Sequence, residues 1–155
     1  SSQDGQARAL SLYYRGAILN RQGRADEASK SLDQALAERP DLVAAREEKG
    51  ESLWLLGRKE DATSVWKEAI RENPRLPLAN NFLAGAADAN GRRDEAATYE
   101  KQAEASTPKD PYYQWMLGLR LQNLGMNKLA EKQFGRAVEL NPAFILRRGR
   151  DLRKP

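Results

Sequence analysis

Residues 43–76 read VAAREEKGESLWLLGRKEDATSVWKEAIRENPRL, and this stretch predicts two helices with a short turn between them. Gly57 lies at the turn, where glycine supplies the positive φ that commonly ends a helix. Glu60 and Asp61 open the second helix, where acidic side chains favour the positive end of the helix dipole. Pro74 ends that helix because proline cannot continue one. The stretch is therefore one helical pair.

The landmarks of this stretch recur every 34 residues along most of the chain. Random composition does not keep four columns in phase, and a strict period of this length indicates an array of helical repeats that pack on their neighbours. The four columns are Pro40, Pro74, Pro108 and Pro142; Gly23, Gly57, Gly91 and Gly125; Ala28, Ala62, Ala96 and Ala130; and Ala35, Ala69, Ala103 and Ala137.

These columns divide the chain into four units of equal length. The repeat is placed so that proline takes the thirty-second position of each unit. We expect an N-terminal flank at 1–8, the four units at 9–42, 43–76, 77–110 and 111–144, and a basic C-terminal cap or tail at 145–155.

The residues of the units carry a family resemblance. The chain resembles a tetratricopeptide repeat array, whose pattern is W-x2-L-G-x2-Y, then A-x3-F, then P. The resemblance covers 9–144 and implies an all-α solenoid, a right-handed superhelix of antiparallel helix pairs. The RNA-reading pentatricopeptide family is a less suitable match because its repeat is typically one residue longer. The fourth unit fits the pattern with Leu117, Gly118, Leu121, Ala130, Phe134, Ala137 and Pro142.

Composition excludes several classes of function. The chain has neither cysteine nor histidine, which removes thiolate nucleophiles, the commonest general base and the commonest zinc ligands. We therefore expect no enzyme, no cofactor and no metal site. No apolar run is long enough to span a membrane. A cysteine-free array is equally compatible with cytoplasm and periplasm. Because the first residue is not Met, we expect a segment of a larger protein, of bacterial origin by its composition.

The resemblance implies that the first helices line a concave groove and that four places of each unit face it. Aromatic side chains there are candidate anchors for a partner, and amides are candidate hydrogen-bonding groups for a peptide or a sugar. The alternative is that the large aromatics pack between neighbouring first helices. The predicted partner-binding residues are Tyr13, Asn20, Glu47, Glu51, Trp54, Asn81, Tyr112, Trp115, Leu119 and Gln122.

Glu47 and Glu51 lie four residues apart and are the paired carboxylates that we expect to face the groove. Such a pair can perform acid–base chemistry or hold a cation, but no nucleophile or further ligand accompanies it. A basic or amide-rich partner is the better interpretation. Some relatives clamp a carboxylate with Lys, Arg and Asn at fixed places, and the corresponding places of this chain hold no cation. We expect Glu48 to face solvent.

Two segments depart from the repeat pattern. The third unit has Ala84 where the other units have glycine, and Glu100 where they have Leu, Trp or Phe. This predicts either a closer-packed or slightly softer repeat, or a functional pocket, with Tyr99 compensating for the missing aromatic. The end segment contains the five basic residues that give the chain its net charge of +4. It is either a cap, with Phe144, Ile145 and Leu146 covering the last apolar face, or a basic patch.

The sequence thus predicts a protein–protein interaction scaffold that binds an extended peptide or a helix of another protein in its groove. Association of copies through the ends of the array is a further expectation. Two alternatives stay open. One is binding of nucleic acid or another acidic surface through the basic tail, which is the less favoured. The other is carbohydrate binding in the groove as part of an export or envelope assembly.

Overall fold

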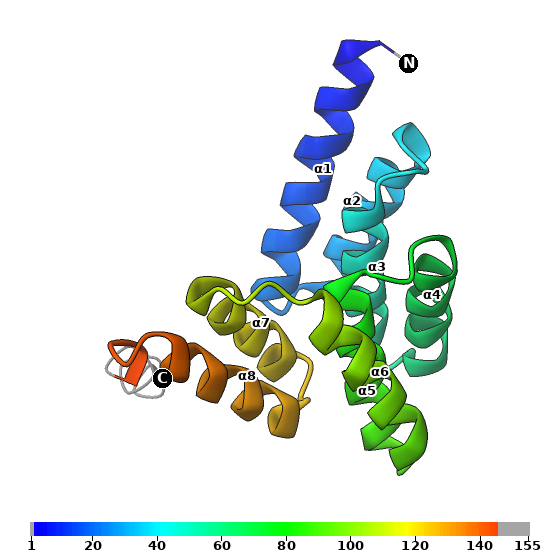
Figure 1. Ribbon diagram of the computed structural model, residues 1–155. Helices are drawn as coiled ribbons and strands as arrows, with labels where there is room; N and C mark the ends of the chain where they lie inside the picture. Colours follow the sequence, from blue (N-terminus) through cyan, green and yellow to red (C-terminus); the bar gives the residue numbers. More distant parts are fainter. Residues whose placement is uncertain (1, 146–155) are drawn as a thin grey trace.

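The computed structural model describes residues 2–145, and this part of the chain folds as an all-α solenoid of four helix pairs (Figure 1). The two helices of each pair run antiparallel, as the repeat pattern predicts. The helices are α1 (Gln3–Arg21), α2 (Ala25–Glu38), α3 (Val43–Leu55), α4 (Lys59–Glu72), α5 (Pro77–Ala89), α6 (Arg93–Ser106), α7 (Pro111–Asn123) and α8 (Asn127–Leu140).

The turn inside each pair has the predicted left-handed glycine. Gly57 has a φ of 81°, and the equivalent glycines of the other three units also have positive φ. Asp110 caps α7, since its Oδ2 accepts a hydrogen bond from the backbone N–H of Tyr113 at 3.0 Å. The first helix is longer than the repeat predicts. It begins at Gln3 and so includes most of the segment that we expected to be a flank.

Each regular pair is held together by a glycine that faces a large side chain. A Cβ added to Gly50 would lie 2.1 Å from Nε1 of Trp66, so no larger residue fits at this place. The third pair lacks this contact because Ala84 and Glu100 replace the two partners. Tyr99 is half-buried and packs against the main core, in agreement with the prediction that it compensates.

The stacking of the pairs changes between the third and the fourth. Helix α2 packs on α3, and α4 packs on α5, whereas α6 has little close backbone contact with α7. Helix α6 buries only Ala96 and Ala103, so it offers little apolar surface to a neighbour. Ion pairs take its place: Glu100 contacts Lys132 of α8 at 3.2 Å.

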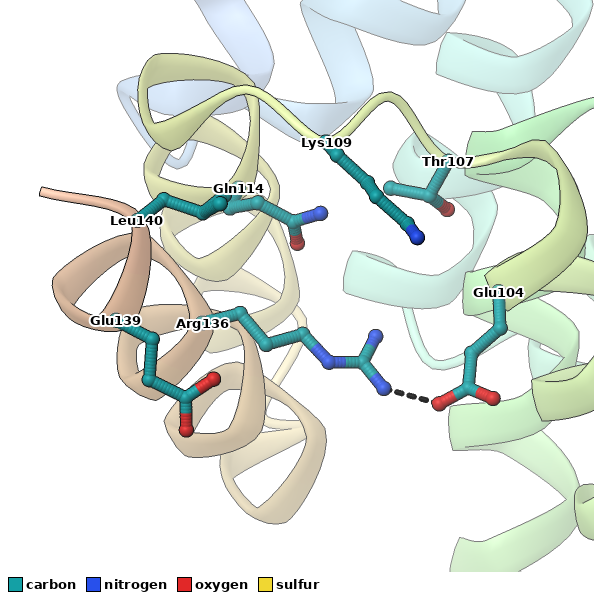
Figure 2. Close-up of a pocket in the computed structure, with 7 residues that line it drawn as sticks. All are labelled: Glu104, Thr107, Lys109, Gln114, Arg136, Glu139 and Leu140. Carbon is teal, nitrogen blue, oxygen red and sulfur yellow. Dashed lines mark hydrogen bonds and ion pairs between the residues drawn. The ribbon is translucent and has the colours of Figure 1, made fainter.

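A cavity of about 410 Å³ lies where α6 and α7 would otherwise meet. Figure 2 shows Arg136 of α8 reaching across it to the carboxylate of Glu104 on α6. Gln114 of α7 and Lys109 of the preceding loop also line it. The third unit is therefore not a regular repeat: α5 is packed in the main core, whereas the side of α6 toward the fourth unit carries polar side chains around a cavity.

The fourth pair is attached to the rest of the molecule through its turn. Leu124 and Met126 of this turn are buried in the main core, together with Trp54, Trp66 and Phe82. This core extends from the second unit to the fourth, while the first unit contributes a smaller cluster around Leu32 and Ala35.

The last described residues cover the end of the array. Phe144 is buried, with its ring centroid 5.5 Å from that of Trp115 and 5.2 Å from that of Tyr112. This agrees with the predicted cap, although Ile145 is 59% exposed. Leu146 and the basic residues 147–155 lie outside the described part. Within that part, no helix combines the length and the apolar character needed to cross a membrane.

Candidate functional site

The inner faces of α1, α3 and α5 form the floor of what we call the groove, and α7 lies against this floor. The fourth unit covers much of its floor, so the predicted groove residues have different environments. Asn20, Glu47, Glu51, Trp54, Asn81 and Trp115 are buried, Tyr13 is half-buried, and Tyr112, Leu119 and Gln122 are exposed. Tyr112, Leu119 and Gln122 are therefore accessible to a partner without any movement of the chain, whereas the six buried residues are largely inaccessible in this arrangement.

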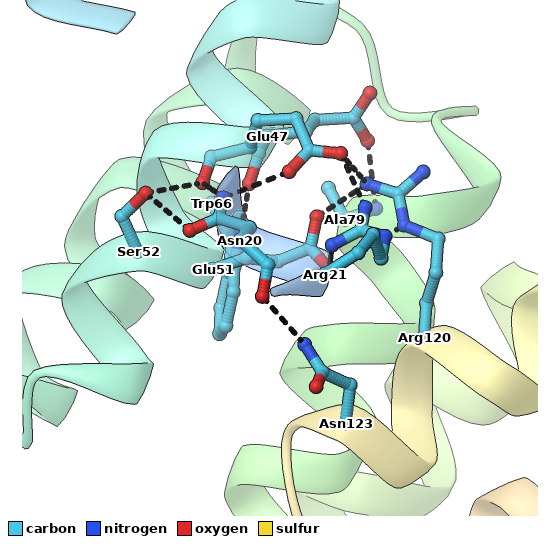
Figure 3. Close-up of polar contacts among 10 residues, drawn as sticks. Asn20, Arg21, Glu47, Glu51, Ser52, Trp66, Ala79, Arg120 and Asn123 are labelled. Carbon is cyan, nitrogen blue, oxygen red and sulfur yellow. Dashed lines mark hydrogen bonds and ion pairs between the residues drawn. The ribbon is translucent and has the colours of Figure 1, made fainter. Parts of the chain in front are cut away.

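An ionic cluster of Arg21, Glu48, Glu51 and Arg120 connects three helices across the groove (Figure 3). Arg120 extends from α7 and donates to Glu48 Oε1 at 2.8 Å and to the carboxylate of Glu51. Arg21, near the end of α1, pairs with both carboxylates as well. Glu51 is fully buried, and the side chain of Arg120 is 10% exposed. The cluster therefore places an arginine of the fourth unit on the acidic floor provided by α3.

Glu48 is buried in this cluster, contrary to the expectation that it faces solvent. Asn20 of α1 holds it in place: Nδ2 of Asn20 donates to Glu48 Oε2 at 2.9 Å, and Ser52 Oγ donates to Asn20 Oδ1 at 2.8 Å. The backbone carbonyl of Asn20 also accepts from Nδ2 of Asn123, at 3.4 Å (Figure 3). Asn20 thus links α1 to both α3 and α7.

Glu47 lies beside the cluster but makes a different contact. Its Oε2 accepts a hydrogen bond from the backbone N–H of Ala79 at 2.9 Å, in the first turn of α5 (Figure 3). Burial raises the pKa of the Glu47 carboxyl to about 7, against the opposing effect of Arg120. Burial also raises the pKa of Glu51, to about 6. For Arg120, burial opposes the charge, but the carboxylates of Glu51 and Glu48 hold its pKa above the ordinary value.

The contacts of Glu47, Glu48 and Glu51 join neighbouring helices to one another. Each carboxylate accepts hydrogen bonds from arginine or backbone donors, and no group of acidic side chains within residues 2–145 is arranged to hold a metal ion. The arrangement stabilises a buried positive charge and the N-terminus of α5.

The turn of the fourth unit occupies the remainder of the floor. Trp54 Nε1 donates to the backbone carbonyl of Leu124 at 2.8 Å. Met126 lies so close to α5 that a Cβ added to Gly85 would be 2.3 Å from its Sδ. The ring of Trp54 is therefore neither a free platform for a ligand nor packed only between neighbouring first helices. It contacts a unit two positions along the array.

One part of the groove remains open, and we call it the mouth cavity. It has a volume of about 390 Å³ and is lined by Arg21, Tyr112, Trp115, Met116, Leu119 and Arg120. Tyr112 is 62% and Leu119 41% exposed. Trp115 is buried, and its Nε1 has no hydrogen-bond partner among the described residues. The mouth cavity thus combines exposed apolar side chains with two arginines.

Sequence reasoning missed Glu48, Arg120 and Met126, although the repeat columns contain a signal for each. The repeat position of Glu48 holds tyrosine, phenylalanine or methionine in the other three units. The repeat position of Arg120 holds isoleucine, serine or alanine in the other three. A charged residue interrupts each column. Met126 interrupts a column that is otherwise arginine. An apolar residue in a place that is elsewhere charged indicates a contact that the other units lack.

Comparisons with known proteins agree with this architecture. Models of the tetratricopeptide repeat match residues 15–74, 60–111 and 111–144. The solved structure of TTC0263, a thermophilic TPR protein of Thermus thermophilus, is 23% identical, with a TM-score of 0.66, over 93% of this chain and 81% of that one. None of the curated proteins compared with the chain matches it.

Two structures of MamA are similar as well. One crystal structure is 21% identical, with a TM-score of 0.60, over 87% of this chain and 79% of that one. MamA from Desulfovibrio magneticus RS-1 is 18% identical, with a TM-score of 0.59, over 87% and 76% of the two chains. At these identities the likeness shows the fold.

Proposed function

Because the chain belongs to the tetratricopeptide repeat family, whose arrays serve as scaffolds for protein interactions, we propose that it is a non-enzymatic module that binds another protein through the mouth cavity. The partner contributes an extended segment or a helix. The observation that carries this proposal is the exposure of Tyr112 and Leu119 beside a cavity of about 390 Å³.

The chemistry of the mouth cavity supports a peptide as the ligand. Large aromatic and aliphatic side chains bury much area at a low cost in side-chain entropy, as in the energetic centres of protein interfaces. The ring of Trp115 also lines the cavity and adds apolar surface beside Tyr112 and Leu119. Arg21 and Arg120 are engaged with Glu48 and Glu51, so the apolar side chains provide most of the contact.

A pair of substitutions tests this proposal. We expect Tyr112→Ala together with Leu119→Ala to weaken capture of a partner by at least about tenfold while helicity is unchanged, since hot-spot truncations typically cost more than 1 kcal/mol each. The measurement is affinity capture from the source organism, followed by titration of the captured protein. Trp115 is not a suitable target because its removal would damage the core beside Phe134 and Phe144.

Leu56→Ala is the matched control, because Leu56 is 42% exposed, like Leu119, but lies in the turn of the second unit. The Leu56→Ala variant is expected to capture the partner as well as the native chain does. Equal capture by the double variant and the native chain would refute a role for the mouth cavity.

A further inference from the structure

The fourth unit occupies the floor of the groove as a ligand would. It presents a single arginine, Arg120, to an acidic site formed by Glu48 and Glu51. It places the apolar turn residues Leu124 and Met126 beside Trp54 and on α5. These contacts are made by a helix and its following turn.

The other contacts of the fourth unit are weaker. Between α6 and α8 they are exposed or half-exposed ion pairs, and a cavity lies where α6 and α7 would stack. Exposed ion pairs contribute little to stability. The position of the fourth unit therefore depends on the ionic cluster and on the turn, both of which lie in the groove.

The floor is acidic even when it is occupied. Glu47, Glu48 and Glu51 are all buried on α3, and the cations that pair with Glu48 and Glu51 are Arg21 and Arg120. If the fourth unit were removed, Arg21 would be the remaining ion-pair partner of Glu48 and Glu51 among the described residues, beside a third carboxylate, that of Glu47. Such a site has a strong preference for a new cation in the place of Arg120.

We propose that the floor of the groove is a binding site for a partner helix that presents an arginine, and that the fourth unit covers this site until the partner displaces it. The partner's arginine takes the place of Arg120 between Glu48 and Glu51, and an apolar residue following it contacts Trp54. This proposal rests on the proposed function because it assumes that the ligand is another protein. It differs in the site, since the partner binds the floor of the groove rather than the mouth cavity.

The repeat columns supply a variant that releases the fourth unit without disturbing its own fold. Leu124→Gln and Met126→Arg introduce the residues that the first unit has at the same places, Gln22 and Arg24. Both are exposed there, at a turn of the same kind. This double change removes two apolar side chains from the main core, including the contact of Met126 with Gly85, and is expected to open the groove.

A second variant holds the fourth unit in place. A Cβ on Gly85 would lie 3.3 Å from the Cβ of Met126, close to the separation found in disulfides, so Gly85→Cys with Met126→Cys can form a crosslink. The native chain has no cysteine, and therefore no competing disulfide can form within it. Met126→Cys alone, treated with the same oxidant, is the control.

The probe is a labelled synthetic peptide with the sequence of residues 111–126, and its binding to the full chain is measured by fluorescence anisotropy. We expect the released variant to bind more tightly than the native chain, and the oxidised crosslinked variant to bind at least ~10-fold more weakly than the released one. Reduction should restore binding to the crosslinked chain. The same peptide with Arg120→Gln is expected to lose binding to the released variant.

Three outcomes would overturn the proposal. The released and crosslinked chains could bind the peptide equally, or neither chain could bind it. The native peptide and its Arg120→Gln form could also bind the released variant equally. Circular dichroism confirms that each variant keeps its helical content. A partner that requires Tyr112 and Leu119 but binds the crosslinked chain as well as the released one would leave the mouth cavity as the binding site and refute the role of the floor.

Discussion

Glu47 is a buried carboxyl whose position is set by the backbone of the neighbouring unit. Its hydrogen bond to the N–H of Ala79 satisfies an orphan donor at the start of α5, where negative charge is favoured. Burial nevertheless raises its pKa to about 7. The folded state thus binds this proton more tightly than the unfolded chain does. The stabilisation from proton binding is complete below about pH 4.5 and is lost as the pH rises through about 7.

We therefore expect Glu47→Gln to reduce the fall in stability between pH 5 and pH 8. The amide oxygen of glutamine can still accept from Ala79 without adding a buried charge. A shift from 4.5 to about 7 corresponds to about 3 kcal/mol, so the variant should be more stable than the native chain at pH 8 by up to that amount. Urea unfolding at both pH values measures this.

Glu68→Gln, on the exposed surface of α4, is the control and should leave the pH dependence unchanged. An identical pH dependence in the native chain and the Glu47→Gln variant would contradict the assigned role of Glu47. Glu51 has its pKa shifted in the same direction, so part of the dependence is expected to remain in the variant.

At the scale of residues, the sequence predicts local chemistry better than long-range contacts. The turn glycines, the Asp110 cap and the half-buried Tyr99 follow from local rules or from the repeat columns. The pairing of Glu48 with Arg120 does not, because the two residues are 72 positions apart and no periodicity relates them. Helical spacing alone places Glu48 away from the groove. Glu48 instead meets Asn20 and Arg21 of α1 and Arg120 of the fourth unit.

Among the helices, α6 and α8 explain why the fourth unit is attached differently from the others. Helix α6 has glutamates on the side that faces α8, and their partners are Lys132 and Arg136. Charged side chains need not be desolvated at a loose contact, whereas a close contact of α6 with α7 would bury them at a high cost. The replacement of a large apolar residue by Glu100 is thus visible in the sequence, but the resulting cavity is a property of the packing.

We expect the amides of α7 and α8 to exchange with solvent through an opening that leaves α3, α4 and α5 folded. A unit that is joined to the rest of the chain by few buried apolar contacts opens at a lower free energy than the whole chain, here by on the order of 2 kcal/mol. Hydrogen exchange measured by mass spectrometry over the native chain checks this. In the oxidised Gly85→Cys, Met126→Cys variant, the amides of α7 and α8 should be protected as strongly as those of α3, α4 and α5. Uniform protection of all central helices in the native chain would disprove a separate opening.

For the whole molecule, the repeat period predicts the number and order of the helices and most of their bounds. It does not predict how far the array turns back on itself, because the period describes only contacts between adjacent units. In the structure, Asn20 of the first unit and Asn123 of the fourth are in contact. The predicted groove residues therefore divide into a covered floor and an open mouth cavity, and no local pattern distinguishes the two groups.

The end of the array yields a further prediction. Phe144→Ala should destabilise the chain by roughly 3 kcal/mol, because it removes a buried aromatic from the rings of Trp115 and Tyr112. Thermal unfolding measures the change. Ile145→Ala alters an adjacent residue that is 59% exposed and should have little effect. Similar losses in the two variants would argue against Phe144 as the cap of the last unit.

The ionic cluster also limits how this array can lengthen during evolution. Tandem arrays gain members when a segment of the gene is duplicated, and a new member needs to fit only its neighbours when every contact is between adjacent units. Here a duplication between α3 and α7 would carry Arg120 away from Glu48 and Glu51 and leave two buried carboxylates with Arg21 as their remaining ion-pair partner. The spacing of the second and fourth units is therefore fixed by electrostatics, and only additions outside this segment preserve the contact.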